Sequence, residues 1–226
     1  MDYRRTYRAA AVSFADLVSR LPADRWDTPG LGDWTLRELV GHTVSSALRQ
    51  VPTVLAAPAA AVTLTSPQAY WAFARCAPPE MYAAATAASS ADARQTGEWL
   101  GDDAAGRVSE LAGQATGALA AVRDDDVITT PAGGMRVRDW LPTRTFELVV
   151  HGMDIAGAAA VPFEPAPDAV TESVTLAARI AAAVGDGPLV LRALTRRAAL
   201  PGDFSVVYAR RDQPRDTARP HRRRPM

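Results

Sequence analysis

Hydrophobic residues recur along most of this chain at the spacing of one helical face. Between residues 3 and 21, apolar side chains repeat at i, i+3, i+4 and i+7, which predicts an amphipathic helix that ends before Pro22. The same reasoning predicts helices over residues 35–55, 83–122, 140–157, 169–184 and 189–194. Four long helices and two shorter additions predict an all-α protein, a four-helix bundle with additional short helices.

Local signals divide these helices. Thr35 and Glu38 have the spacing of a capping box, which predicts the start of the second helix. The stretch 83–122 is expected to break near Gly97 and again at Gly101–Asp103. Residues 124–137 predict a short extended piece with a glycine turn, after which Asp139 is expected to cap the next helix.

Length and composition limit the class of protein. A chain of 226 residues can bury one sizeable core. No run of about 18 uncharged apolar residues is present, so no membrane span is expected. The first residues lack the apolar segment of a secretory signal. A single cysteine excludes an intramolecular disulfide and favours a reducing cytoplasm.

The net charge of zero conceals a strong asymmetry. Residues 210–226 carry seven arginines against two aspartates, a net charge of +5, so the rest of the neutral chain carries −5. An acidic body lacks the basic face that nucleic-acid binding requires, so no nucleic-acid partner is expected. We expect residues 209–226 to form a solvated, disordered, arginine-rich tail.

The helix expected after Asp139 carries the most informative polar residues. At about 100° per residue, Glu147, His151 and Asp154 fall on one face of that helix. Because Glu147 and His151 are four residues apart, their side chains point the same way and can reach one cation. Two ligands do not complete a metal site, so a third must come from another part of the chain.

Few residues can supply that third ligand. The chain has three histidines, and His221 lies in the arginine-rich tail, which leaves His42. His42 lies off the apolar stripe of its helix, so it faces either solvent or a polar cleft. A His/Glu/His set suits Zn²⁺ and leaves a coordination position open, as in catalytic sites. Cys76 is interpreted as a small apolar residue; as a fourth ligand it would close that position.

The two halves of this pattern together resemble a known family. Trp34-Thr-Leu-Arg-Glu-Leu-Val-Gly-His42, followed by Arg144-Thr-Phe-Glu147-Leu-Val-Val-His151-Gly-Met-Asp154, is similar to the mycothiol-dependent maleylpyruvate isomerase family. That family belongs to the DinB-like metal-binding helical bundles. The resemblance implies that His42, Glu147 and His151 bind zinc, with Asp154 in or behind the ligand set. No second α/β domain of the kind that the isomerase itself carries is evident.

The resemblance also implies a division of the chain. Residues 1–160 would form the DinB-like metal-binding bundle, and residues 161–208 a helical extension packed on it. Residues 209–226 would follow as the disordered tail. Monomer and homodimer both remain open.

The implied activity is mycothiol-dependent thiol chemistry in the cytoplasm. Zinc would hold mycothiol as a thiolate for transfer to, or addition–elimination isomerisation of, a small electrophilic substrate. Arg144 would hold a carboxylate or a polar group of mycothiol, with Arg75 as a second candidate for cofactor binding. Asp154 would orient a histidine or accept a proton.

Two other classes of function fit the same residues. A zinc hydrolase would use metal-bound water and would turn over without added thiol. A non-catalytic bundle would bind metal or thiol only, since a fold does not by itself establish chemistry.

Overall fold

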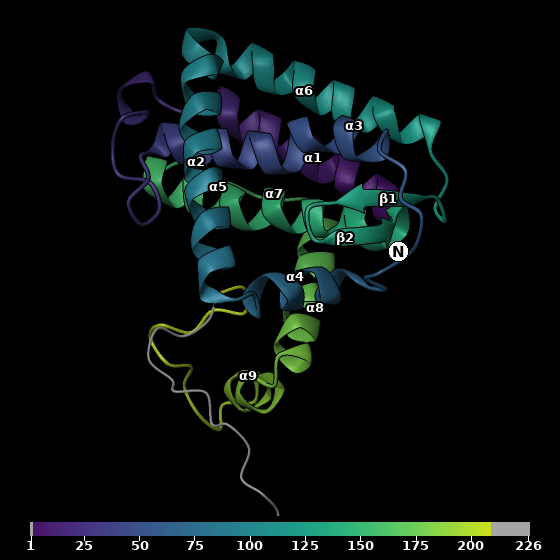
Figure 1. Cartoon of the computed structure of the whole chain (residues 1–226). Coiled ribbons are helices and arrows are strands. Elements are labelled where there is room, and N and C mark those ends of the chain that lie inside the picture. Colours follow the sequence, from purple (N-terminus) through teal and green to yellow (C-terminus); the bar gives the residue numbers. More distant parts are fainter. Residues whose placement is uncertain (1, 209–226) are drawn as a thin grey trace, which may run out of the picture.

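The computed structural model describes residues 2–208, which fold as the predicted all-α protein of the DinB-like bundle type (Figure 1). The helices are α1 (Tyr3–Ser19), α2 (Leu36–Val44), α3 (Gln50–Leu55), α4 (Pro67–Arg75), α5 (Pro79–Leu100), α6 (Ala104–Ala118), α7 (Val137–Ala159), α8 (Pro167–Ala183) and α9 (Gly187–Leu194). Short 3₁₀ turns occupy Ala23–Arg25, Gly101–Asp103 and Leu119–Ala121. No helix in the described range is long and apolar enough to cross a membrane. The predicted disordered tail lies outside the described residues.

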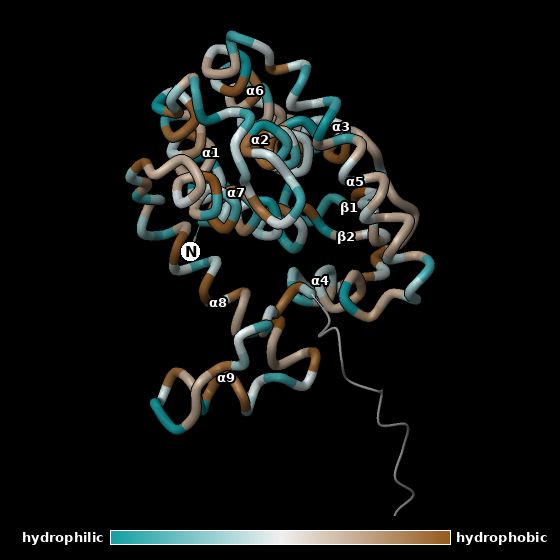
Figure 2. The backbone as a smooth tube through the Cα atoms, turned by 90° about the vertical axis from the view of Figure 1, so that its left-hand side faces the viewer, coloured by the Kyte–Doolittle hydropathy of each residue, from teal (hydrophilic) through white to brown (hydrophobic). Residues whose placement is uncertain are grey.

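The core of the bundle lies between α1, α2, α3, α6 and α7 (Figure 1). Helix α1 packs against both α6 and α7, and α5 crosses α2 on the outside. Fully buried side chains from all of these helices fill the centre, among them Tyr7, Phe14, Leu39, Leu48, Leu119 and Trp140. Helix α8 packs against α7, α4 and α1, and leads away from the bundle to α9 in both views (Figures 1 and 2).

The second predicted helix is one continuous rod, but its middle is not α-helical. The capping box at Thr35 and Glu38 is confirmed, and Ser45–Arg49 between α2 and α3 form a π-helix. Pro52 has no N–H, and its ring crowds the carbonyl four residues earlier, so the helix widens before it.

The widened segment exposes carbonyl groups to side chains of other helices. The Ser46 carbonyl accepts a hydrogen bond from the Arg144 guanidinium at 2.9 Å, and the Ala47 carbonyl accepts one from the Tyr7 hydroxyl at 2.7 Å. The π-helix is therefore tied to both α1 and α7.

The expected break near Gly97 is wrong, because α5 runs through that residue to Leu100. Gly97 serves close packing instead. A Cβ on Gly97 would lie 2.7 Å from the Arg37 carbonyl oxygen, and a Cβ on Gly41 would collide with the Ala93 carbonyl. The two glycines let the backbones of α2 and α5 touch. The second expected break, at Gly101–Asp103, is confirmed as a 3₁₀ turn.

Replacing Gly41 by alanine should destabilise the protein by about 1–3 kcal/mol, the usual cost of overpacking. The added methyl group would push α5 away from α2, next to His42. Chemical unfolding monitored by circular dichroism measures the change. Gly117→Ala is the matched control, because nothing lies within 4 Å of its added Cβ on α6 and the substitution should stabilise that helix. Equal stability of the two variants would contradict the close-packing argument.

The extended piece is confirmed as a hairpin of β1 (Val127–Thr130) and β2 (Gly133–Arg136), which pair antiparallel. Its turn is Pro131 and Ala132, so the glycines lie in the second strand and not in the turn. The expectation that Asp139 caps the next helix is also wrong. Helix α7 begins at Val137, directly after β2, because the hairpin delivers the chain to it in an extended conformation.

Candidate metal centre

Helix α7 lies at the centre of the molecule, in contact with α1, α2, α4 and α8. It is therefore buried on nearly every side, and its polar residues are buried with it. Glu147 is 7% exposed and His151 is 8% exposed. Their i, i+4 spacing brings His151 Nε2 to 3.2 Å from Glu147 Oε2. The predicted polar face of this helix is thus directed into the protein rather than into water.

His42 reaches the same point from α2. Its Nε2 lies 3.8 Å from Glu147 Oε2, and its ring meets that of His151 edge-on, with centroids 5.0 Å apart. One ligand atom of each residue lies within 4.8 Å of the others, so His42, Glu147 and His151 form a group that could hold a metal ion. The sequence left open whether His42 faces solvent or a polar cleft, and in the structure it faces the polar cleft.

Each imidazole is oriented by a partner at its other nitrogen. His151 Nδ1 lies 3.0 Å from Asp154 Oδ2, and His42 Nδ1 lies 3.1 Å from Ser89 Oγ. The Trp34 ring packs against His42 with centroids 4.8 Å apart. Metal-binding histidines typically have such a second hydrogen bond, which directs the free nitrogen at the metal. Both Nε2 atoms accordingly face Glu147, so the residues fit a divalent cation.

The three grouped residues lie inside a range that matches a known protein family. A family model described as the mycothiol maleylpyruvate isomerase N-terminal domain matches residues 7–156, which is more than half of the chain and includes all three grouped residues. The chain belongs to this family. No curated protein and no solved structure matches it. Residues 7–156 are thus a domain of a mycothiol-related family, and the observed helical bundle is consistent with the fold of that family.

The grouped residues of this family domain form a tightly coupled charge cluster. Burial alone would raise the pKa of Glu147, but hydrogen bonds from His151 and His42 and the nearby charges of His151 and Arg144 hold that pKa well below its usual range. Burial would likewise lower the pKa of His151, but its contacts with Asp154 and Glu147 raise it to about 9. Near neutral pH the cluster without metal therefore holds a carboxylate and a protonated imidazole.

Arg144 lies one turn before Glu147 on α7 and is buried among side chains of the bundle. It is 2% exposed, and its guanidinium donates to the Ser46 carbonyl at 2.9 Å and to Gln50 Oε1 at 3.1 Å. It also lies over the Tyr70 and Trp140 rings. Its Nη2 is 3.9 Å from Glu147 Oε1, so its nearest charged partner is the carboxylate of the cluster. The positive charge of Arg144 thus faces the Glu147 carboxylate within the protein interior.

Arg75 is likewise engaged within the chain. It forms an ion pair with Asp186 at 2.6 Å and donates to the carbonyls of Ser205 and Val206 at 2.8 and 3.1 Å. These bonds hold the segment after α9 against α4. The role of Arg75 in cofactor binding stays a prediction. Cys76 is exposed and is not among the grouped residues.

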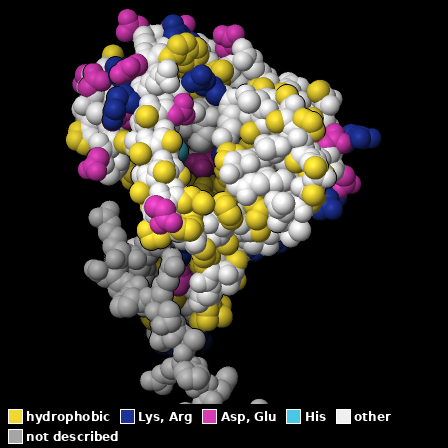
Figure 3. All heavy atoms as spheres, viewed as in Figure 1, with side chains coloured by type: hydrophobic (Ala, Val, Ile, Leu, Met, Phe, Trp, Pro, Cys, Tyr) yellow, Lys and Arg dark blue, Asp and Glu magenta, His cyan; other side chains and the backbone are white. Residues whose placement is uncertain are grey.

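Two cavities meet at the cluster. One of about 340 Å³ is lined by His42, Glu147, His151, Asp154 and, from the C-terminal segment, Ser205, Val207 and Tyr208. The other, of about 400 Å³, shares His42 and Tyr208 with it. Figure 3 shows a hollow on this face, with histidine and acidic side chains inside it and hydrophobic side chains along its lower edge. The cluster is therefore buried but reachable.

Sequence reasoning missed Ser89 and Tyr208. Ser89 lies on α5 in a run of alanine and serine, where no periodicity distinguishes it from its neighbours. Tyr208 follows a loop of irregular structure, and only the folded chain brings it to His42. Neither residue carries a local signal that could have indicated its place in the site.

Proposed function

We propose that this domain binds zinc through His42, Glu147 and His151 and uses it to activate mycothiol for reaction with a small electrophile in the cytoplasm. The observation that carries the proposal is the convergence of the three ligand atoms within 4.8 Å, with both histidines oriented by a second hydrogen bond. The family match supports mycothiol as the thiol, since the family description names mycothiol.

A zinc ion held by two imidazoles and one carboxylate lowers the pKa of a bound thiol, so that the reactive thiolate persists near neutral pH. Glu147 supplies the negative charge of the ligand set, and the nearby charge of Arg144 helps to keep that carboxylate ionised. Asp154 keeps the His151 ring turned toward Glu147. Arg144 and Asp154 are therefore positioning residues.

The reaction itself is a polar addition or substitution. One S–C bond forms from the thiolate to the electrophilic carbon, and the thiol proton has already left to solvent. In conjugate addition the neighbouring carbon takes up a proton, and in substitution a leaving group departs with the electron pair. Addition followed by elimination of the same thiol isomerises a double bond. No oxidant or reductant is required.

The purified protein tests this proposal directly. We expect about one zinc per chain by elemental analysis, and saturable mycothiol binding with proton release by calorimetry. Zinc without thiol binding would overturn the thiol chemistry. Turnover of an ester or amide without added thiol would indicate the hydrolase instead, and absence of metal would contradict the ligand assignment.

Metal binding should also depend on pH in a defined way. Because the pKa of His151 is raised to about 9 in the metal-free cluster, a metal must displace its proton at any lower pH. Zinc affinity should therefore rise about tenfold per pH unit between about pH 7 and 8.5. Calorimetry in buffers of different ionisation enthalpy measures the protons released.

In the Asp154→Asn protein the pKa of His151 should be lower, so that fewer protons are released at pH 8. Proton release that is the same in both proteins, or affinity independent of pH, would contradict the proposed ligand role of His151.

A further inference from the structure

The cavity of about 400 Å³ beside His42 has the size of a small-molecule site. Its walls come from α2, α4, α5, the β-hairpin turn and the C-terminal segment, so residues far apart in sequence close around one space. Most of its lining side chains are aromatic or aliphatic, including Tyr70, Phe73, Met81 and Pro131.

Several of these apolar side chains are unusually exposed. Phe73 is 45% exposed, Met81 is 51% exposed and Tyr82 is 39% exposed. Single exposed apolar residues are ordinary on a protein surface, but a cluster that lines one concavity marks a binding site. These three side chains come from α4 and α5 and gather around the same cavity.

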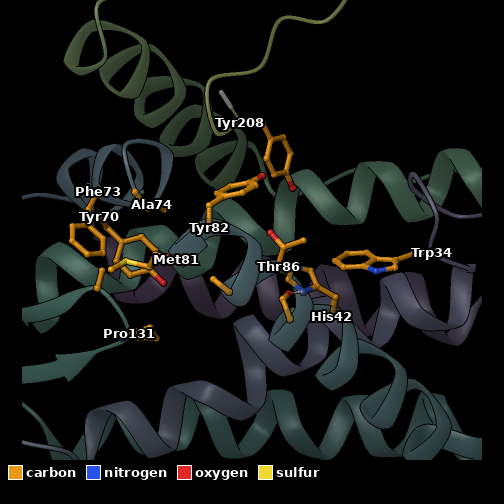
Figure 4. A pocket seen from close by; sticks show the side chains of 14 residues that line it. Trp34, His42, Tyr70, Phe73, Ala74, Met81, Tyr82, Thr86, Pro131 and Tyr208 are labelled. Carbon is orange, nitrogen blue, oxygen red and sulfur yellow. Dashed lines mark hydrogen bonds between the residues drawn. The ribbon is translucent and has the colours of Figure 1, made fainter. Parts of the chain in front are cut away.

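The cavity leads from an apolar end to the candidate metal centre. Figure 4 shows Tyr70, Phe73 and Met81 together at one end, and His42 and Trp34 at the other. Tyr82, Thr86 and Tyr208 lie between these ends. A molecule whose apolar part lies against Phe73 and Met81 therefore extends its other part toward His42.

The described part of the lining carries hydroxyl groups from Tyr70, Tyr82, Thr86, Ser89 and Tyr208 and no arginine or carboxylate. The nearby arginines are engaged elsewhere: Arg144 with Ser46 and Gln50, and Arg75 with Asp186 and the C-terminal segment. A carboxylate placed at the apolar end would give up part of its hydration without gaining a counter-charge from the described lining residues, which is unfavourable.

We propose that this cavity binds the electrophilic acceptor, and that the acceptor is an uncharged, largely apolar compound with about one aromatic ring and a carbonyl-conjugated double bond. The inference rests on the proposed function for the thiol, and it specifies the substrate class. The ring lies among Tyr70, Phe73 and Met81, and the conjugated carbon faces His42. The thiolate sulfur bonds to the β-carbon, and the α-carbon then takes a proton from water.

Binding of unreactive ligands tests the cavity without metal or thiol. The probes are 4-phenyl-2-butanone and its para-carboxylate, which differ by one charge and contain no reactive double bond. Calorimetry and tryptophan fluorescence measure their affinities for the whole protein. We expect the neutral ketone to bind at least about tenfold more tightly, a difference of about 1.4 kcal/mol.

A matched pair of variants tests the charge argument. Ala85 lines the cavity on α5, whereas its exposed neighbour Ala84 does not. Ala85→Arg should raise the affinity for the carboxylate probe at least about tenfold, and Ala84→Arg should leave it unchanged. Equal binding of the two probes to the unmodified protein, or binding of neither, would overturn the proposal.

Turnover separates this inference from the proposed function. Benzylideneacetone, the unsaturated relative of the neutral probe, should lose its enone absorbance in the presence of protein and mycothiol. Binding of the neutral ketone without any turnover would overturn the thiol chemistry while supporting the apolar ligand class. Turnover that favours the para-carboxylate of benzylideneacetone would overturn the substrate class and leave the thiol chemistry standing.

Discussion

Replacing Glu147 by glutamine should cost the protein its metal and its thiol-dependent activity. The amide has the same shape as the carboxylate but carries no charge, so two neutral imidazoles would remain as the only strong ligands of zinc. Changes behind a ligand typically lower metal affinity about 10–100-fold, so loss of the charged ligand itself should exceed about a hundredfold. Elemental analysis after dialysis, with zinc titration of the metal-free protein, measures the effect.

Glu164→Gln is the matched control for this variant. Glu164 is exposed in the loop before α8, outside the metal cluster, and the chemical change is identical. The control should keep its zinc and its activity. A Glu147→Gln protein that retains one zinc per chain with ordinary affinity would remove Glu147 from the ligand set.

Replacing Arg144 by methionine should reduce the free energy of unfolding by about 3–5 kcal/mol. The substitution keeps the apolar volume but removes three hydrogen bonds, to the Thr143 hydroxyl, the Ser46 carbonyl and the Gln50 side chain, and leaves these acceptors without that donor. It also removes the cation that lies between the Tyr70 and Trp140 rings and beside Glu147. Urea unfolding monitored by circular dichroism measures the loss.

The control for this second prediction is Arg8→Met, at an exposed position on α1. It should change stability by less than about 0.5 kcal/mol. Arg144→Lys should recover only part of the loss, because an ammonium group cannot donate to both acceptors with the planar geometry of a guanidinium. An Arg144→Met protein as stable as the unmodified chain would show that the buried charge contributes nothing to folding.

Helical spacing predicted the arrangement of the candidate site well. Because Glu147 and His151 are four residues apart on a single helix, their proximity is a local property of the sequence. The capping box at Thr35 defined the start of α2 for the same reason. The approach of His42 to that pair joins two helices distant in sequence, and it was predicted from the small number of histidines and then from the family resemblance, not from periodicity.

The predictions that went wrong concern interactions between elements. Gly97 was expected to break a helix, since glycine has a low helix propensity, but its missing side chain is what α2 requires for close contact. The internal partners of Arg144 and Arg75 could not be predicted either, because only their charge is visible in the sequence, and their roles in ligand binding stay predictions. Arg75 meets Ser205 and Val206, which lie 130 and 131 residues further along the chain. Such pairings exist only in the folded chain.

The π-helix at Ser45–Arg49 has a consequence for how the length of this chain can vary. A π turn holds one more residue than an α-helix would use, so it behaves as a single-residue insertion between His42 and α3. Deleting one residue there would restore a regular helix with Val51 and Val54 still facing the core, but it would withdraw the Ser46 and Ala47 carbonyls from Arg144 and Tyr7. Shortening the chain by one residue between His42 and Val51 would therefore leave the core face of α3 in place and act on the contacts that the π-helix makes with α1 and α7.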